Sequence, residues 1–234
     1  GTGFFIEGNN AITSSAFFKN GAFARAITSD GVVRRVVSVS AFDTQSGLVQ
    51  LELENMLSSN ISGLRLSSEV NPGANFKLIV AENTGNSRAH SIKIDKVEQY
   101  IGYGPAIKTG DDLTNFQAGA PLINSSGQVV GIVMPTDNSG KEYVVVNTRV
   151  VENLKPVSKS VPEFGTVAGF QNFTTQGIYA MMDGDQEKAL SAFGKAKSTQ
   201  QDNISNHYYS GLVNFQLGKL SAARTDLTNA IGID

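Results

Sequence analysis

The chain has no cysteine and only two histidines among its 234 residues. The lack of cysteine excludes disulfide bonds, thiolate metal ligands and a cysteine nucleophile. His90 and His207 lie far apart in the sequence, so we expect no zinc site, no other metal site and no cofactor. A phosphate-binding glycine loop is also absent, because Gly102 and Gly104 flank Tyr103 as in a β-turn.

The sequence also lacks a long apolar run and an excess of charge of one sign. No stretch approaches the roughly 18 apolar residues of a membrane-spanning helix, so we predict no integral membrane segment. Lysine and arginine total 19, and aspartate and glutamate total 21, which leaves no basic footprint for nucleic acid. We therefore expect a protein or peptide partner, with the oligomeric state left open.

The first two-thirds of the chain have the pattern of a β-rich architecture. Apolar alternation and β-branched runs predict strands at 3–6, 11–13, 32–39, 48–53, 76–80, 91–97, 129–133 and 143–146. Short strands joined by turn residues, with no long helical period between them, indicate a closed all-β architecture. A short helix is expected near 150–154.

A domain boundary is predicted between Lys155 and Pro162, where two prolines and two serines occur. We accordingly expect a β-rich domain at 1–157, a linker at 158–167 and a helical domain at 168–234. Because the sequence opens inside a strand-like segment, we expect the chain to be a piece of a longer protein.

The helical segment repeats itself at a fixed interval. Five pairs share the same spacing: Gly177 and Gly211, Gly184 and Gly218, Ala189 and Ala223, Phe193 and Leu227, and Ala196 and Ala230. Small residues at such positions let paired helices approach closely, and the larger ones fill the space between them. The interval and the pattern resemble the tetratricopeptide repeat, a helix-turn-helix unit of about 34 residues. The resemblance covers 168–234 and implies two repeats.

Stacked repeats of this kind commonly bind peptides on the concave surface formed by their first helices. By register, that surface would include Ile178, Met182, Tyr208 and Leu212. It would carry no lysine and no asparagine, so capture of a terminal carboxylate is not expected. Two interpretations stay open: the face binds an apolar or aromatic partner, or it packs on the β-rich part.

A second resemblance starts from the stretch Phe116–Ile132. It is similar to the nucleophile loop of trypsin-like serine proteases, commonly Gly-Asp/Asn-Ser-Gly-Gly-Pro-Leu followed by a strand, a turn and Val-Val-Gly-Ile. In this chain Ala118 stands at the position of the nucleophile, and Gly119 follows it.

Two earlier segments extend this resemblance. The stretches Gly1–Ile6 and Ala11–Phe17 are similar to those that lead to the general base in Htr-type bacterial members, and the base position falls on Ala16. The strand that begins at Leu48 is similar to the one that follows the family's aspartate, which places that position at Gly47. The separations along the chain, from Ala16 to Gly47 and from Gly47 to Ala118, are both usual in the family.

The resemblance spans about residues 1–155 and implies a trypsin-like double β-barrel. The expected fold class is therefore multidomain β + α, with that double barrel followed by helical hairpins of the tetratricopeptide type. By family analogy alone, it also suggests a periplasmic or cell-envelope location.

The catalytic part of the resemblance fails at all three positions. A serine protease triad needs a hydroxyl, an imidazole and a carboxylate, and Ala118, Ala16 and Gly47 supply none of them. Loss of the nucleophile or the base alone costs on the order of a millionfold in turnover. Phe116 and Ala120 also replace glycines of the oxyanion turn, and a bulky residue there disfavours the conformation that points amides at an oxyanion.

We therefore predict a pseudoprotease that acts as a protein-binding or scaffolding module, with Phe116 and Gly119 as candidate contacts in the former substrate cleft. Two alternatives remain. The chain could be a serine hydrolase that uses displaced residues such as Ser14 or Ser15, or it could be a purely structural spacer.

Overall fold

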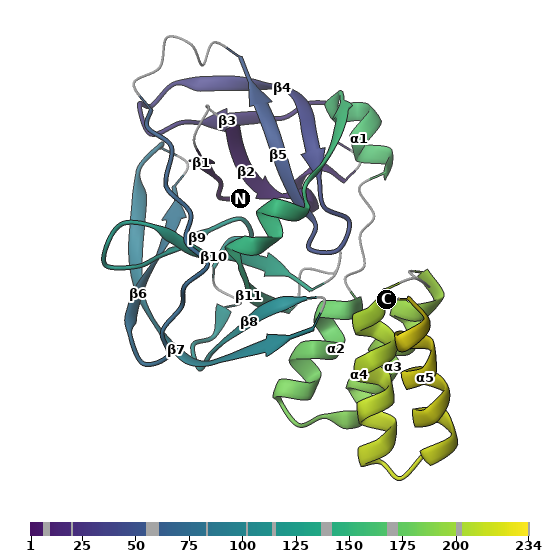
Figure 1. The fold of residues 1–234 in the computed structure, drawn as a ribbon. Helices are drawn as coiled ribbons and strands as arrows, with labels where there is room; N and C mark the ends of the chain where they lie inside the picture. The colour runs from purple at the N-terminus through teal and green to yellow at the C-terminus, as the bar shows by residue number, and fades with distance from the viewer. Residues whose placement is uncertain are drawn as a thin grey trace. The chain divides into compact units, whose positions relative to one another are not determined.

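The computed structural model of the protein (Figure 1) describes residues 1–6, 10–19, 21–54, 61–82, 84–101, 103–113, 116–136, 142–167, 173–199 and 203–233. They form two compact units, each with its own apolar core. The first comprises residues 1–97 and 107–171, and the second comprises 98–106 and 172–234. Within the described ranges, no helix combines the length and the hydropathy that a membrane span requires.

The first unit contains a six-stranded antiparallel sheet. Its order is β1 (Phe4–Ile6), β2 (Asn10–Ser14), β5 (Leu48–Leu53), β4 (Val33–Phe42) and β12 (Lys155–Lys159), with β3 (Arg25–Ile27) also paired to β4. The long strand β4 changes register twice against β5, at Val36/Ser38 and at Val39/Ala41. Such bulges bend a strand and increase its twist, which curls this sheet around its core.

The same unit contains a closed barrel. Around it run β10 (Val129–Pro135), β11 (Tyr143–Asn147), β8 (Gly104–Thr109), β7 (Ser87–Tyr100), β6 (Asn75–Ala81) and β9 (Pro121–Ile123). Its interior is filled by branched aliphatic side chains such as Leu78, Ile94, Leu122 and Val133, all fully buried.

Most of the predicted strands are confirmed, and the helix expected near 150–154 is a 3₁₀ helix, η4 (Thr148–Asn153). The strands β3, β8 and β12 were not predicted. Of the two expected barrels, the one formed by β6 to β11 closes, whereas the other is a curled sheet among the described residues. The segment between β5 and β6 pairs with both sheets through isolated parallel bridges, from Leu64 to Ile6 of the six-stranded sheet and from Leu66 to Val129 of the barrel.

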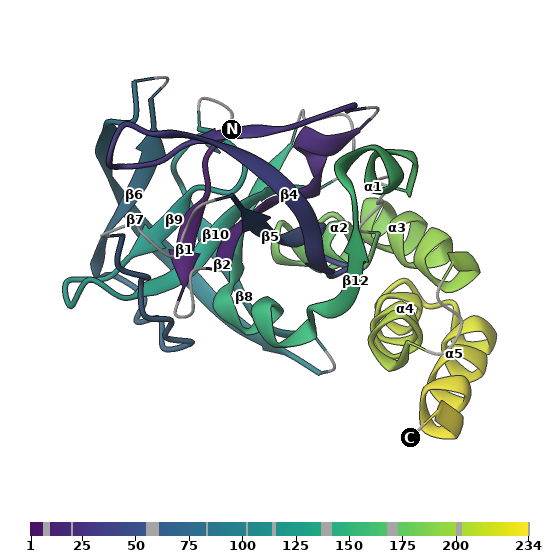
Figure 2. The same cartoon turned by 90° about the horizontal axis from the view of Figure 1, so that it is seen from above.

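The predicted linker at 158–167 is ordered structure of the first unit instead. β12 pairs with β4, and α1 (Val161–Val167) follows it, as Figure 2 shows. The α1 side chains Val161 and Phe164 are buried, and the Phe164 ring packs edge-on against Phe42 with centroids 5.0 Å apart. The described part of the segment expected as a linker is therefore ordered and packs within the first unit.

The prolines of this segment fit the ordered structure. Pro156 lies on β12, which pairs on one side only, and Pro162 lies in the first turn of α1; both are places where a missing N–H is tolerated. Glu163 caps the start of α1 in the manner of one half of a capping box, because its carboxylate accepts the Ser160 N–H and Oγ–H at 3.0 and 2.6 Å. These bonds lower the pKa of Glu163.

The second unit is built from four helices: α2 (Phe173–Met182), α3 (Gln186–Thr199), α4 (Ile204–Gln216) and α5 (Leu220–Ile233). α2 packs on α3, and α4 packs on α5. A Cβ added to Gly177 would lie 2.6 Å from the Phe193 ring, and one added to Gly211 would lie 2.7 Å from Leu227. Gly177 therefore contacts Phe193 in the first helix pair in the same way as Gly211 contacts Leu227 in the second.

Candidate functional site

Ala16, the position expected for the general base, lies in the short helix η1 (Ser15–Phe18) that follows β2. Its backbone N–H donates to the Oγ of Ser14 at 3.3 Å, which caps the helix. The Ala16 methyl is partly buried and packs against the core of the six-stranded sheet. This position therefore supplies packing and offers no group that could accept a proton.

Gly47, the position expected for the triad aspartate, closes the turn between β4 and β5. It has a φ of +73°, a conformation that glycine adopts without strain. Its carbonyl accepts the N–H of Ser15 at 2.8 Å, which holds the turn next to η1. The carboxylate nearest in sequence belongs to Asp43, which accepts the N–H and the Oγ–H of Ser46 at 2.9 and 2.6 Å and so builds the turn itself.

Ala118 is 4% exposed, and its carbonyl accepts the N–H of Thr2 at 3.2 Å. Gly119 has a φ of +80° and donates its N–H to Val133 at 2.7 Å. A Cβ at Gly119 would lie 2.1 Å from the Thr2 carbonyl and 2.6 Å from Oγ1 of Thr13. This loop therefore lies against β2, which leads directly into the helix of Ala16, and the Gly47 turn is bonded to Ser15 of the same helix. The three residues expected at the triad positions thus lie on neighbouring segments.

Phe116 is the residue expected in place of a glycine of the oxyanion turn. Its N–H donates to the carbonyl of Leu113 at 3.0 Å, so that amide is already engaged. Its side chain is partly buried against the barrel core, and the ring lies edge-on to His90 with centroids 5.0 Å apart. One of the two histidines therefore borders this loop, on an exposed part of β7.

The displaced serines are both buried. Ser14 and Ser15 have no exposed surface, and Ser14 uses its Oγ as the cap of η1. The Oγ of Ser15 has no hydrogen-bond partner among the described residues. Neither hydroxyl is bonded to an imidazole in the described structure, and neither is open to a substrate.

The four helical residues expected on a peptide-binding surface lie in or against the core of the second unit. Ile178 is fully buried and Met182 is 9% exposed, while Tyr208 and Leu212 are half-buried against the same cluster. Ile178 and Met182 are therefore core residues rather than surface contacts. The cluster also contains Tyr100, from the β7–β8 hairpin, which belongs to this unit.

The hairpin segment at 98–106 is held by side chains of α4. The Tyr209 hydroxyl accepts the N–H of Ile101 at 2.5 Å, and the Ser205 hydroxyl donates to the Ile101 carbonyl at 2.7 Å. The rings of Tyr100 and Tyr209 meet edge-on with centroids 5.1 Å apart, and the Tyr103 hydroxyl lies 3.0 Å from Oγ1 of Thr175. Burial, and then the Glu98 carboxylate, raise the pKa of Tyr100.

The place of this hairpin in the second unit was not predicted from the sequence. The only local signal was the pair of nearby tyrosines, Tyr100 and Tyr103, which a β-turn also explains. Which surface they would meet depends on side chains far along the chain, such as Ser205.

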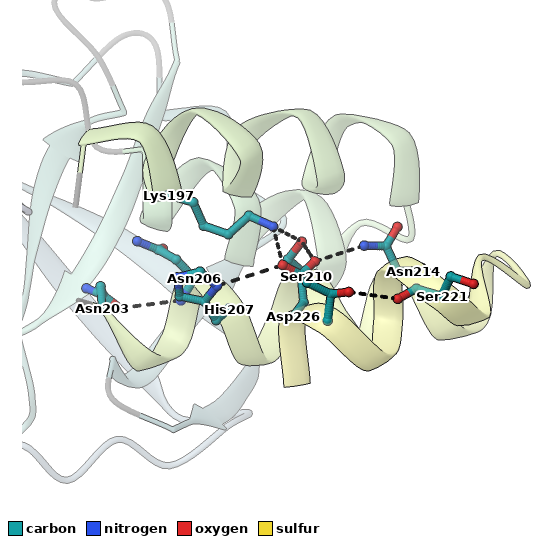
Figure 3. A network of polar contacts seen from close by, with 9 residues as sticks. Lys197, Asn203, Asn206, His207, Ser210, Asn214, Ser221 and Asp226 are labelled. Atoms are coloured by element: carbon teal, nitrogen blue, oxygen red, sulfur yellow. Dashed lines mark hydrogen bonds and ion pairs between the residues drawn. The ribbon is translucent and has the colours of Figure 1, made fainter. Parts of the chain in front are cut away.

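The second unit also holds a buried polar network (Figure 3). Lys197 donates to Asp226 at 2.6 Å and to Ser210 at 2.9 Å. Ser210 and Asn214 donate to the other carboxylate oxygen of Asp226 at 2.7 and 3.0 Å, and Nδ1 of His207 lies 3.7 Å from Asp226. Burial alone would raise the pKa of Asp226, but the bonds from Lys197, Ser210 and Asn214 lower it overall.

The network contains a serine, a histidine and an aspartate, but its bonding is not that of a triad. The Ser210 hydroxyl has no exposed surface, accepts from Lys197 and donates directly to Asp226. In a triad, the serine hydroxyl donates to the imidazole instead. The network therefore joins α3, α4 and α5 and stabilises the unit. Among the described residues, no group of three His, Asp or Glu side chains could hold a metal ion.

Comparison with solved structures finds trypsin-like serine proteases. The inactive form of the Rv3671c protease matches with a TM-score of 0.50 at 20% identity, over 65% of this chain and 81% of that one. The fold is that of a trypsin-like protease. Deg5 matches with a TM-score of 0.52 at 16% identity, over 64% and 78%, and the HtrA-type protease AlgW with 0.52 at 15%, over 65% and 49%. No family model and no curated protein matches the chain.

Proposed function

We propose that the chain is a pseudoprotease, a trypsin-fold unit that does not cleave peptide bonds and acts with its helical unit as a protein-binding scaffold. The observation that carries this proposal is the convergence of Ala16, Gly47 and Ala118 through hydrogen bonds that maintain the loops of a protease site. The three residues expected at the triad positions supply no hydroxyl, imidazole or carboxylate, which supports the proposal.

Two further contacts support the loss of catalysis. The Phe116 N–H is bonded to Leu113, so it would have to break that bond before it could stabilise an oxyanion. Gly119 is fixed by the Thr2 and Thr13 atoms next to it, which leaves the loop little freedom to rearrange. A substrate carbonyl placed here would meet neither a nucleophile nor a free pair of donors.

The helical unit is proposed to consist of two tetratricopeptide repeats. The repeat spacing reappears as two equivalent close contacts, Gly177 on Phe193 and Gly211 on Leu227. Gly184 and Gly218, separated by the same interval, both have positive φ in the turns between paired helices. Repeats of this kind serve as binding surfaces in many proteins, which supports a scaffolding role.

A fluorophosphonate probe tests the absence of catalysis. We expect no specific labelling of the folded chain, and no cleavage of a broad peptide library, because Ser14 and Ser15 are buried and have no imidazole partner in the described residues. Ser15→Ala is the informative variant, since removing an unpaired buried hydroxyl leaves the fold intact. Labelling of the parent chain that disappears in this variant would establish the alternative, a hydrolase with a displaced nucleophile.

Pull-down with the full chain tests the scaffolding role. We expect a saturable protein partner whose binding is unchanged by Ser15→Ala, because no chemistry is involved. A chain that captures no saturable partner would instead be a structural spacer. Tyr208→Ala and Leu212→Ala then report whether the helical face contributes, with their circular dichroism as the control for folding, since both side chains pack on the core.

A further inference from the structure

The outer face of the β3–β4 hairpin is unusually apolar for an exposed surface. Phe23 is 70% exposed, Val33 57%, Ile27 42% and Val37 41%. The opposite face of the same hairpin is already buried, because Ala24, Ala26 and Val36 pack into the core of the six-stranded sheet. A sheet segment that is apolar on both faces, with one face covered, is typical of an interaction surface.

The register of the hairpin arranges these side chains in rows. Ile27 lies opposite Val33, and Arg25 lies opposite Arg35. The ladder continues with the Val36 N–H bonded to the Ala24 carbonyl, so Phe23 comes next to Val37 in the following row. Along the outer face, an apolar row is therefore followed by a basic row and then by a second apolar row. Two arginines directly opposite each other are unfavourable in isolation, which favours an acidic group from outside the hairpin.

Acidic groups lie on the neighbouring strand of the same face. Glu52 on β5 and Glu54 just after it are both exposed. The Glu54 carboxylate oxygen Oε2 lies 3.6 Å from Nε of Arg35 on β4. Arg25 has no carboxylate partner in the described structure; its guanidinium lies 5.6 Å from the centre of the Phe23 ring. One side of this face is therefore basic and the other acidic, with exposed apolar side chains among them.

We infer that this face, formed by β3, β4 and β5, binds a second copy of the chain. A two-fold axis parallel to the strands would bring the arginine side of one copy over the glutamate side of the other, as a self-complementary interface requires. The apolar side chains would then be buried between the copies. A strongly acidic or basic partner would satisfy only half of the face, whereas a second copy satisfies both halves.

The hairpin is also held in place before any partner arrives. Asp30 in its turn binds the guanidinium of Arg34 through both carboxylate oxygens, at 3.0 and 2.7 Å, and accepts the Thr28 hydroxyl at 2.5 Å. Those bonds, the Arg34 bond first, hold the pKa of Asp30 well below its usual range. A preorganised face loses less conformational entropy when it binds.

Sedimentation velocity of the full chain, with two complementary charge reversals, tests this inference. Arg25→Glu/Arg35→Glu makes the face acidic, and Glu52→Lys/Glu54→Lys makes it basic. Each variant alone should self-associate at least about 100-fold more weakly than the parent chain, because like charges then meet across the interface. A one-to-one mixture of the two should restore the dimer. Restoration also shows that both variants are folded.

Lys77→Glu/Lys93→Glu is the matched control, because it changes the net charge as much as the arginine reversal does but lies on the exposed side of β6 and β7. It should leave the dimer unchanged. A parent chain that is monomeric up to its solubility limit would overturn the inference. So would a dimer that both reversals leave intact, since another surface would then hold it together. Neither outcome bears on the absence of catalysis, which the probe experiment tests separately.

Discussion

The two units handle serine, histidine and aspartate in opposite ways. The unit with a protease fold carries none of the three at the expected positions, where Ala16, Gly47 and Ala118 stand. The helical unit brings a serine, a histidine and an aspartate together in its interior, where they serve structure. Residue types therefore say little about chemistry until exposure and the direction of each hydrogen bond are known.

The units also use glycine differently. In the first, Gly119 combines a positive φ with backbone and side-chain atoms that exclude a Cβ. In the second, Gly177 is an ordinary helical residue whose missing side chain makes room for a facing ring. Gly119 is therefore constrained by its backbone conformation and Gly177 by side-chain packing, and substitutions should separate the two effects.

Gly119→Ala should have the largest effect. The new methyl would combine a strained φ with a clash against the Thr2 carbonyl, which cannot move without breaking the loop, and we expect roughly 3–5 kcal/mol of destabilisation. Gly127→Ala is the control, because Gly127 has a similar φ of +76° and open space around it. Its cost should be about 1–2 kcal/mol in the same urea titration. Equal costs would mean that the close contact contributes nothing.

Asp226→Ala should come next, because it leaves Lys197 without its partner. The side chains of Lys197 and Asp226 are only 23% and 10% exposed, so we expect the variant to lose about 2–4 kcal/mol of unfolding free energy. Urea titration monitored by the helical circular-dichroism signal measures this loss. The double variant Lys197→Met/Asp226→Leu removes both charges and should recover most of this loss. If the double variant is as unstable as Asp226→Ala, the unpaired charge of Lys197 is not the cause of the destabilisation.

Gly177→Ala should destabilise the helical unit by about 1–3 kcal/mol, since the Phe193 ring must shift to admit the methyl. Gly194→Ala, on the exposed side of α3 with nothing nearby, should instead stabilise it by about 0.5–1 kcal/mol through helix propensity. Opposite signs in thermal unfolding would confirm that packing decides. A stabilising Gly177→Ala would contradict the close contact.

The smallest expected effect is a dependence of the helical unit on acid. Because the pKa of Asp226 is lower in the folded state, its contribution is complete above the ordinary aspartate value of about 3.9 and is lost as the pH falls through the folded value. The midpoint temperature of thermal unfolding should therefore decrease as the pH falls below about 4, and Asp226→Asn should flatten that slope. Lys197 and His207 also face this carboxylate, at 2.6 and 3.7 Å. An unchanged slope in Asp226→Asn would assign the effect elsewhere.

Much of the architecture was predictable, for a local reason. Alternating side chains predict strands such as β5, and the spacing of Gly177 and Gly211 predicts paired helices, because both patterns are set by neighbours close in sequence. The assignment of Ala16, Gly47 and Ala118 to the triad positions, made from motif and spacing, stays a prediction. β12 and α1 were missed because two prolines suggested a break, although Ser160 and Glu163 already carried a capping signal.

What only the tertiary structure decided concerns contacts between distant segments. The sequence alone determined that Ala16, Gly47 and Ala118 carry no hydroxyl, imidazole or carboxylate, since no fold can supply those groups to an alanine or a glycine. It could not determine that the hydroxyls of Tyr209 and Ser205 would hydrogen-bond to the backbone of Ile101, because these bonds join segments far apart in the chain. Nor could it determine that Ile178 lies in the core. Burial depends on which surfaces meet, and that is settled only when the chain is folded.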